Sequence, residues 1–362
     1  MGYPSTVLPA PLLHADRALH ALHQRRSFSQ HLNPLNGPEA SRSFRSGADA
    51  PPFRYRPTTW ADEELRRLDA LEVPEDHPFG VLMNRAILGT GLFIRALRDR
   101  SPEAFDALAR HNRWYPDEET LIAAQSEQRE RDSAPFALGS AVMVNALRDA
   151  LTERGLGDWR VEEDPVMSAR VLVDGAKRLL RVSPNARFRQ RDIARLVVHE
   201  IEVHAIRATN GQNQPLKLFA TGLPGSLETE EGLALYAEEC SGSASPGTAW
   251  RQGVVVQAVD WARRMGFREL YERIASEAAP GLAWGVSERL KRGLADPSRP
   301  GVYAKDIVYY RGSRRVRAWV QAGNPVRNLY VGKVGLDDPV QQWLDAGLIT
   351  LQPLPRVFRG AA

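Results

Sequence analysis

The chain has 362 residues, of which 43% are hydrophobic and 25% charged, and these proportions exclude a largely disordered protein. With 48 Lys and Arg against 44 Asp and Glu, the formal net charge is +4, which is too small for the dense basic surface of a duplex-binding protein. One cysteine, Cys240, excludes a disulfide framework or a cysteine-rich zinc knuckle within one chain.

The first part of the chain has little periodicity. Residues 1–52 are rich in Ser, Arg, His, Pro and Ala, and they predict a flexible N-terminal arm with one short helix at Leu13–Gln24. The N-terminus lacks the charged segment and apolar run of a secretory signal, and we find no apolar segment of 18 residues. Together with the composition, these features predict a cytoplasmic protein with neither a membrane nor a nucleic-acid partner.

Helical periodicity begins near Asp62 and continues through ADEELRRLDAL, FGVLMNRAILGTGLFIRAL and SPEAFDALARHNRWY. Ser101 followed by Pro102 is typical of an N-cap and a first helical residue. A further helix, ALGSAVMVNALRDALTERG, ends at Gly155, which suits a left-handed residue after the helix. We therefore expect residues 53–362 to form one mainly helical domain.

Three short β-like segments follow, at WRVEE near 159, at 167–174 and at 178–183. The turn DGAK joins the last two and favours a hairpin, because an Asp-Gly pair adopts positive φ easily. The expected fold class is therefore α+β, mainly α, with a small antiparallel sheet beside the helix Arg189–Thr209. Beyond it, TEEGLALYAEE predicts a helix with Thr229 as its N-cap, and Tyr303–Gly312 predicts the start of another.

The segment HEIEVH carries the first chemical signal. His199 and His204 are five residues apart, whereas metal-binding histidines on a regular helix stand four apart. Five residues turn a side chain by roughly 140° on an ideal helix. A π-bulge, in which hydrogen bonds run from i to i+5, would return both imidazoles to one face. Glu200 would then lie beside a metal and could exchange protons with water.

Glu200 and His204 are also spaced as an ordinary surface pair on a helix. Two observations favour a metal site instead. The segment lies in an apolar frame, IARLVVHEIEVHAI, and buried polar groups there need partners. In addition, TEEGLA places carboxylates early in the next predicted helix, from which a third ligand can come.

HExxxH followed by TEEGLA resembles the QEGLA-motif family, which includes the microtubule-associated tyrosine carboxypeptidases, and the likeness runs from about residue 53 to 350. The resemblance implies a gluzincin-like zinc metallopeptidase that removes a C-terminal residue from a polypeptide. It implies one zinc ion per chain on His199, His204 and Glu231, with Glu200 as general base and acid. Glu230 stands where many relatives have glutamine, and we expect it to support the ligands or cap the helix.

A carboxypeptidase must also hold the terminal carboxylate of its substrate, and a bidentate arginine does so best. The segment AKDIVYYRG resembles the part of the family behind the site, which makes Arg311 the first candidate. Arg207 and Lys217 are the alternatives. Tyr310 or Tyr309 could supply a hydroxyl that polarises the scissile carbonyl.

The predicted function is zinc-dependent removal of a C-terminal residue from a peptide or protein tail. Glu200 separates this from the alternative, a protein of the same fold that binds peptide tails without cleaving them or acts in regulation, because a binding protein has no need of that carboxylate. The sequence does not indicate the preferred substrate or the oligomeric state, and endopeptidase or aminopeptidase action stays open.

Overall fold

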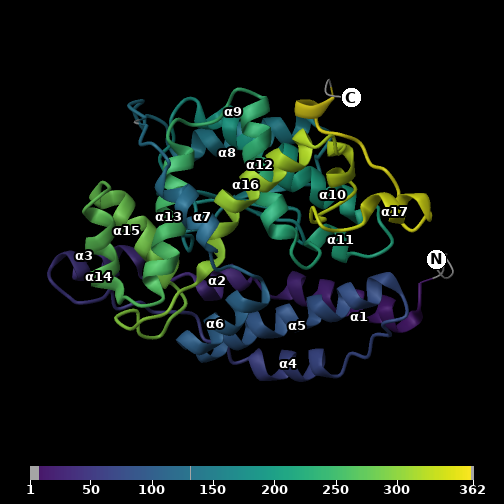
Figure 1. The fold of residues 1–362 in the computed structure, drawn as a ribbon, viewed down its shortest axis with the longest axis horizontal. Coiled ribbons are helices and arrows are strands. Elements are labelled where there is room, and N and C mark those ends of the chain that lie inside the picture. The colour runs from purple at the N-terminus through teal and green to yellow at the C-terminus, as the bar shows by residue number, and fades with distance from the viewer. Residues whose placement is uncertain (1–7, 131, 360–362) are drawn as a thin grey trace.

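The protein is described by a computed structural model that covers residues 8–130 and 132–359. A lower layer of helices is built around the long central helix α5 (Figure 1). Its members are α1 (Ala10–Arg25), α2 (Phe28–Leu32), α4 (Ala61–Asp69), α5 (Pro78–Asp99) and α6 (Pro102–His111). Ser101 caps α6 as predicted, because its hydroxyl accepts a hydrogen bond from the Ala104 N–H at 3.2 Å.

The segment expected to be a flexible arm is helical in its described part. Helix α1 contains the expected helix Leu13–Gln24, and Leu12, Leu19 and Leu22 are buried in the main core. These leucines share one face of the helix and pack it against α5, so residues 10–45 are not a loose arm. The domain boundary that we place between residues 52 and 53 stays a prediction.

Helix α5 is the one described helix that is long and apolar enough to be considered as a membrane span, with a mean hydropathy of 1.2 over its best window. This differs from the expectation that the chain has no apolar segment of such length. In the structure it contacts α1, α2, α4 and α6, and Phe79, Met83 and Ile94 are buried in the core. The length and apolar composition of α5 are therefore also explained by its position at the centre of this helical layer.

The sheet has three strands, β1 (Arg160–Glu163), β2 (Val171–Asp174) and β3 (Leu179–Val182), in the order β1-β3-β2. The predicted hairpin is present, because β2 and β3 pair antiparallel. The sheet as a whole is not antiparallel as expected, because β1 pairs parallel with β3. After β1, residues 164–170 lead the chain to β2 at the other edge of the sheet, and the hairpin then returns the chain as β3 between the two. Strand β3 therefore runs in the same direction as β1.

The hairpin turn also differs from the expectation. Arg178 has the positive φ, 49°, rather than Gly175. Gly175 is required for another reason, because a Cβ at this position would stand 2.9 Å from the Cβ of Ala208 in the helix behind the sheet. The glycine therefore lets the turn pack closely against that helix.

One continuous helical segment lies beside the sheet and consists of α9 (Asp192–Leu196), the π-helix η1 (Val197–Ala205) and α10 (Ile206–Gln212). The predicted bulge within Arg189–Thr209 is thus confirmed as a π-helix around HEIEVH. Helix α8 (Ser140–Glu153) packs against it. Gly155 follows α8 with a φ of 72°, as its predicted role requires.

Helix α12 (Ser226–Cys240) carries EEGLA and packs mainly against η1 and α16 (Ile307–Gln321). Thr229 lies inside this helix and is not its N-cap, which is Gly225 with a φ of 87°. The Thr229 hydroxyl instead accepts a hydrogen bond from the Leu336 N–H at 2.9 Å. The short helix η2 (Ala304–Asp306) leads directly into α16.

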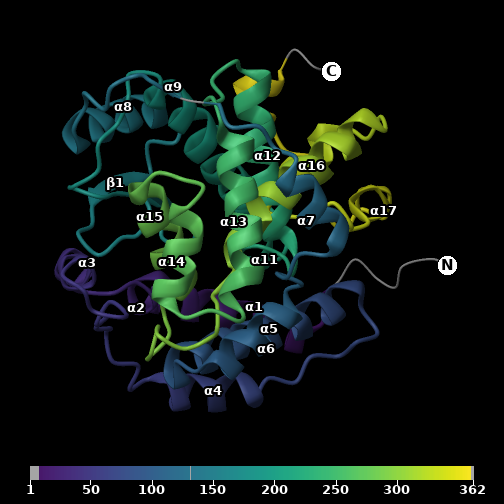
Figure 2. The same ribbon diagram turned by 60° about the vertical axis from the view of Figure 1, so that its left-hand side comes forward.

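Helices α12, α13 and α16 lie in the middle of the molecule (Figure 2), and the bounds of α13 and of the other helices complete the fold. They are α3 (Gly37–Arg45), α7 (Glu118–Gln125), α11 (Leu218–Thr221), α13 (Thr248–Ala262), α14 (Phe267–Ala275), α15 (Pro280–Lys291), η3 (Val326–Tyr330), α17 (Val340–Asp345) and η4 (Arg356–Phe358). The second, smaller core cluster joins α8, the sheet and the buried face of the π-helix.

Candidate functional site

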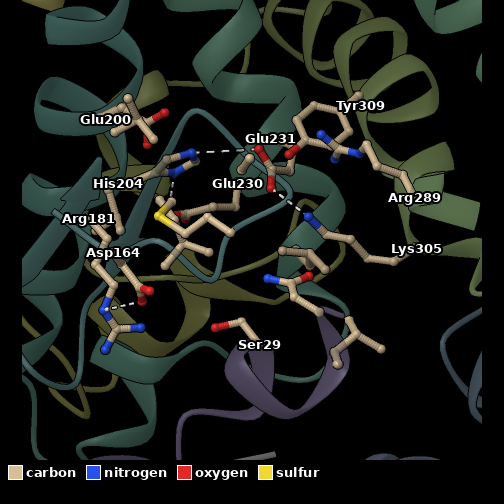
Figure 3. A pocket seen from close by; sticks show the side chains of 18 of the residues that line it. Ser29, Asp164, Arg181, Glu200, His204, Glu230, Glu231, Arg289, Lys305 and Tyr309 are labelled. Carbon is tan, nitrogen blue, oxygen red and sulfur yellow. Dashed lines mark hydrogen bonds and ion pairs between the residues drawn. The ribbon is translucent and has the colours of Figure 1, made fainter. Parts of the chain in front are cut away.

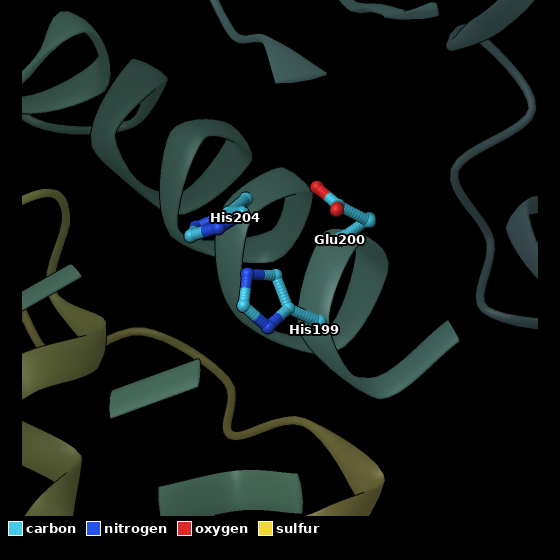
Figure 4. Close-up of side chains that lie close together, drawn as sticks. All are labelled: His199, Glu200 and His204. Atoms are coloured by element: carbon cyan, nitrogen blue, oxygen red, sulfur yellow. The ribbon is translucent and has the colours of Figure 1, made fainter. Parts of the chain in front are cut away.

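The π-helix brings two histidines to one side of its axis. The rings of His199 and His204 lie 4.8 Å apart between centroids, at an interplanar angle of 82° (Figure 4). Both side chains are buried. The wider turn of the π-helix therefore compensates for the five-residue spacing that a regular helix would not bring together.

Glu231 of α12 faces both imidazoles. Its Oε2 atom lies 3.7 Å from Nε2 of His199 and 3.6 Å from Nε2 of His204. These separations suit three ligands of one ion at bond lengths of about 2.0–2.2 Å. The same Oε2 atom is buried and has no hydrogen-bond partner among the described residues, which is costly for a carboxylate unless a cation completes it.

The other nitrogen of each imidazole is held by a carboxylate from α12. His199 Nδ1 lies 2.7 Å from Glu238 Oε1, and His204 Nδ1 lies 2.8 Å from Glu230 Oε1. If each Nδ1 carries the proton, both Nε2 lone pairs point toward Glu231. Metal-binding histidines are commonly oriented in this way by a carboxylate behind them.

Basic side chains hold these supporting carboxylates. Arg195 lies 3.1 Å from Glu238, and Lys333 lies 3.1 Å from Glu230, which is also paired with Arg207. Glu230 therefore supports a histidine, as expected from its place in the motif. Its negative charge, where glutamine would be neutral, is offset by two cations.

Carboxylates create a strongly negative environment around the imidazoles. Burial by itself lowers the pKa of His199, but the carboxylates of Glu231, Glu238 and Glu200 raise it to about 10. Burial likewise opposes ionisation of Glu231, yet Lys305 and the two imidazoles hold the pKa of its carboxyl well below the usual range. The centre thus favours bound positive charge.

Glu200 follows His199 directly, and its carboxylate belongs to the same cluster. Ligand atoms of His199, Glu200 and His204 lie within 4.8 Å of one another. The Glu200 side chain is only 7% exposed, and it has no hydrogen bond or ion pair recorded within the described part of the chain. A carboxylate left in this state is available to a water molecule or a substrate in the site.

Two imidazoles and one or two carboxylates form a donor set that zinc and similar transition metals accept. The unpartnered oxygen of Glu231, the outward hydrogen bonds of both histidines and the negative environment all fit such an ion. A hydrolytic metal site also needs space for water and substrate, and the donors adjoin a cavity.

This cavity has a volume of about 290 Å³. His204 and Glu200 lie on one side of it, Tyr309 and Lys305 lie on the other, and Glu231 lies between them (Figure 3). Lys305 Nζ lies 3.0 Å from Oε1 of Glu231, so that lysine fixes the carboxylate and leaves its other oxygen toward the histidines.

The two tyrosines named in the sequence analysis lie in different surroundings. Tyr310 does not line the cavity, and its hydroxyl donates to Glu127 Oε1 at 2.9 Å, so the structure does not support its predicted catalytic role. Tyr309 lines the cavity as expected. Burial and the nearby charge of Glu231 raise the pKa of Tyr309 to about 12, which keeps its hydroxyl protonated as a donor.

Arg311 does not line the cavity, which corrects the first candidate for carboxylate binding. Its guanidinium donates to Glu228 Oε2 at 2.6 Å and to the carbonyls of Arg113 and Tyr115. These bonds join α16 to α12 and to the loop after α6. Arg311 therefore fastens helices together and has no free donors directed at a substrate.

Both alternative basic residues are also occupied elsewhere. Arg207 is 0% exposed, pairs with Glu230 and donates to the carbonyls of Leu329 and Val334. Lys217 Nζ donates to the carbonyl of Gln212. Neither lines the cavity, so the structure does not support the predicted substrate contact of either residue.

Several residues of the site were not identified in the sequence, namely Glu238, Arg289, Arg292, Lys305 and Lys333. Glu238 had a detectable signal, because it follows Glu231 by seven residues and therefore shares its helical face. Lys305 lies in the segment AKDIVYYRG, four residues before Tyr309, but the other basic residues had no such signal, since their approach to the cavity depends on how distant segments pack.

Known proteins are similar to this chain. A family model described as "Microtubule-associated tyrosine carboxypeptidase" matches residues 47–360. Microtubule-associated tyrosine carboxypeptidase 1 of Mus musculus is 27% identical over 210 residues, which are 55% of this chain and 43% of that protein. The Homo sapiens protein of the same name is 29% identical over 191 residues, covering 49% and 38%.

A third relative, the putative tyrosine carboxypeptidase MATCAP2 of Homo sapiens, is 29% identical over 150 residues, which are 39% of this chain and 28% of that protein. The matches thus span less than half the length of these curated relatives.

Proposed function

This chain belongs to the family of microtubule-associated tyrosine carboxypeptidases, and on that basis we propose that it is a zinc-dependent carboxypeptidase that removes the C-terminal residue of a peptide or protein tail. The proposal includes one zinc ion per chain on His199, His204 and Glu231, in the manner of a gluzincin. A cytoplasmic location and the absence of nucleic-acid and membrane partners stay predictions from the sequence.

The observation that carries the proposal is the convergence of two Nε2 atoms on the unpartnered Oε2 of Glu231. The absence of a recorded partner for Glu200 within the described residues favours catalysis over simple binding of peptide tails. A carboxylate that is buried beside other carboxylates is costly to keep, and a binding protein would gain nothing from it.

In the proposed reaction, Glu200 takes one proton from the attacking water and later gives it to the amine of the departing residue. The peptide C–N bond breaks, and a C–O bond forms from water, so the products are a shortened chain and one amino acid. A zinc ion, when bound, supplies a Lewis acid that lowers the pKa of water and polarises the scissile carbonyl.

Tyr309 is the proposed donor to the carbonyl oxygen as negative charge develops there. It lines the cavity opposite the histidines, and its pKa of about 12 keeps the proton on the hydroxyl at neutral pH. A preorganised donor of this kind lowers the barrier by several kcal/mol in other hydrolases, on the order of 3 kcal/mol for one hydrogen bond.

The proposal is tested by incubating zinc-loaded protein with a peptide library that is diverse at the C-terminus and measuring mass losses. We expect loss of single C-terminal residues, inhibition by a chelator and recovery with zinc. Glu200→Gln should lower turnover by about 10²–10⁴-fold, while one zinc per chain is retained.

Two results would overturn the proposal. The first is purified protein that stays free of metal after zinc loading. The second is a zinc-containing protein that leaves every C-terminus intact while a Glu200→Gln variant binds the same peptides equally well, which would favour the tail-binding alternative.

A further inference from the structure

Arg292 is a basic residue of the cavity that the sequence did not single out. It follows the last residue of α15, and Gly293 after it has a φ of 89°. A Cβ at Gly293 would stand 2.5 Å from the ring of Phe105, so only glycine fits this turn. The turn places Arg292 in the wall of the cavity that also contains the predicted metal ligands.

The Arg292 side chain is buried and makes no direct ion pair among the described residues. It is 8% exposed, and its Nε atom is buried without a hydrogen-bond partner. No ion pair of its guanidinium is recorded among the described residues, although Glu288 and Asp306 are near enough to feel its charge. Its recorded contact is with the ring of Tyr303, whose centroid lies 5.3 Å from the guanidinium carbon.

The other basic side chains in the cavity wall all have carboxylate partners. These pairs are Arg181 with Asp164 and Asp174, Arg289 with Asp306, Lys305 with Glu231, and Lys333 with Glu230. Within the described residues, Arg292 is therefore the basic group of this wall that can accept an external anion without giving up a carboxylate.

We propose that Arg292 binds the terminal carboxylate of the substrate and so restricts the enzyme to chain ends. This inference rests on the proposed function. A guanidinium offers two parallel N–H groups to a carboxylate, and burial makes such a pair stronger than it is in water. In the protein alone, burial of a guanidinium without a direct ion pair costs stability, which is a common property of binding residues.

The test uses zinc-loaded protein with the Glu200→Gln substitution, so that bound peptide is not cleaved. A peptide that the wild-type protein shortens is prepared as its free acid and as its C-terminal amide, and both affinities are measured by fluorescence anisotropy. We expect the free acid to bind at least about 10-fold more tightly, as a charge-assisted bidentate contact allows.

Arg292→Met, which keeps the apolar stem over Tyr303, should bring this ratio to about 1. Arg292→Lys should leave an intermediate ratio, because it keeps the charge and loses the fork. Arg311→Met is the matched control and should keep the full ratio. The melting temperature of Arg292→Met should be equal to that of the parent or higher, since an unpaired buried charge is removed.

The inference is overturned if Arg292→Met keeps the preference for the free acid, or if Arg311→Met loses it, while the wild-type protein still shortens peptides. The same result leaves the proposed carboxypeptidase function intact. If the wild-type protein neither binds nor shortens any peptide, both the proposed function and the role of Arg292 fail.

Discussion

Gly232 of α12 and Gly312 of α16 meet backbone to backbone. A Cβ at Gly232 would stand 2.2 Å from the carbonyl of Gly312, and a Cβ at Gly312 would stand 2.1 Å from the carbonyl oxygen of Glu228. Gly232 directly follows Glu231, and Tyr309 lies one helical turn before Gly312. This close crossing therefore fixes the spacing of the two helices that carry Glu231 and Tyr309, both of which line the cavity.

Gly232→Ala should separate the two helices and lower the free energy of unfolding by roughly 2 kcal/mol, a typical cost of overpacking. The control is Gly285→Ala in α15, where a Cβ would meet no atom within 4 Å. That change should raise stability by up to about 1 kcal/mol, because alanine favours helix. Chemical denaturation measures the unfolding free energy of both variants. If Gly232→Ala changes it no more unfavourably than Gly285→Ala does, the close contact between α12 and α16 is contradicted.

Glu238→Gln should weaken zinc binding by about 10–100-fold, because the carboxylate behind His199 orients its ring and increases its basicity. Competition with a chromogenic chelator measures this affinity. Glu239→Gln removes the neighbouring carboxylate, which pairs with Arg317 on the surface, and should leave zinc affinity unchanged. If Glu238→Gln leaves the zinc affinity unchanged, Glu238 does not support His199 as a ligand.

Asp338 predicts a pH dependence of stability. Burial raises its pKa from 3.8 to about 6, against the Gly335 N–H that donates to its carboxylate at 2.7 Å. The folded state thus holds more protons than the unfolded state between about pH 4 and 6, and stability falls as pH rises through this window. The contribution is fully present below 3.8 and is lost above about 6.

Asp338→Asn should therefore stabilise the protein by about 1 kcal/mol at pH 7.5 and have little effect at pH 4. Denaturation curves at several pH values check the prediction. Asp337→Asn, which removes an adjacent exposed carboxylate, controls for the loss of a negative charge in this loop. A gain that is larger at pH 4 than at pH 7.5 would reverse the sign and refute the assignment.

Lys291 is a buried structural residue at the end of α15, directly before Arg292, and it does not itself line the cavity. It is 0% exposed, and Nζ donates to the carbonyls of Ala262, Arg299 and Gly301 at 3.2, 2.9 and 2.8 Å. Lys291→Met should cost about 3 kcal/mol or more, because these buried acceptors lose their donor. Lys177→Met in the hairpin turn should change stability by less than about 0.5 kcal/mol. Thermal and denaturant unfolding compare the two.

Local sequence patterns predicted many of the helices, including the π-helix, but not α2 and α3 in the segment expected to be a flexible arm. The spacing of His199 and His204 is a property of one segment, and a π-helix is the local way to bring them to one face. The sheet was predicted less well. The pairing of β1 with β3 depends on the path that residues 164–170 take between β1 and β2, and the sequences of the strands do not determine that path.

The sequence by itself determined the residue types of the proposed metal centre, since HEIEVH and TEEGLA specify histidines and carboxylates at helical intervals that local hydrogen bonding fixes. Only the tertiary structure decided that Tyr309 and not Tyr310, and Arg292 and not Arg311, face the cavity. The reason is that a side chain's surroundings come from segments far apart in the chain. A free arginine and one bound to Glu228 look the same in a sequence, and only packing distinguishes them.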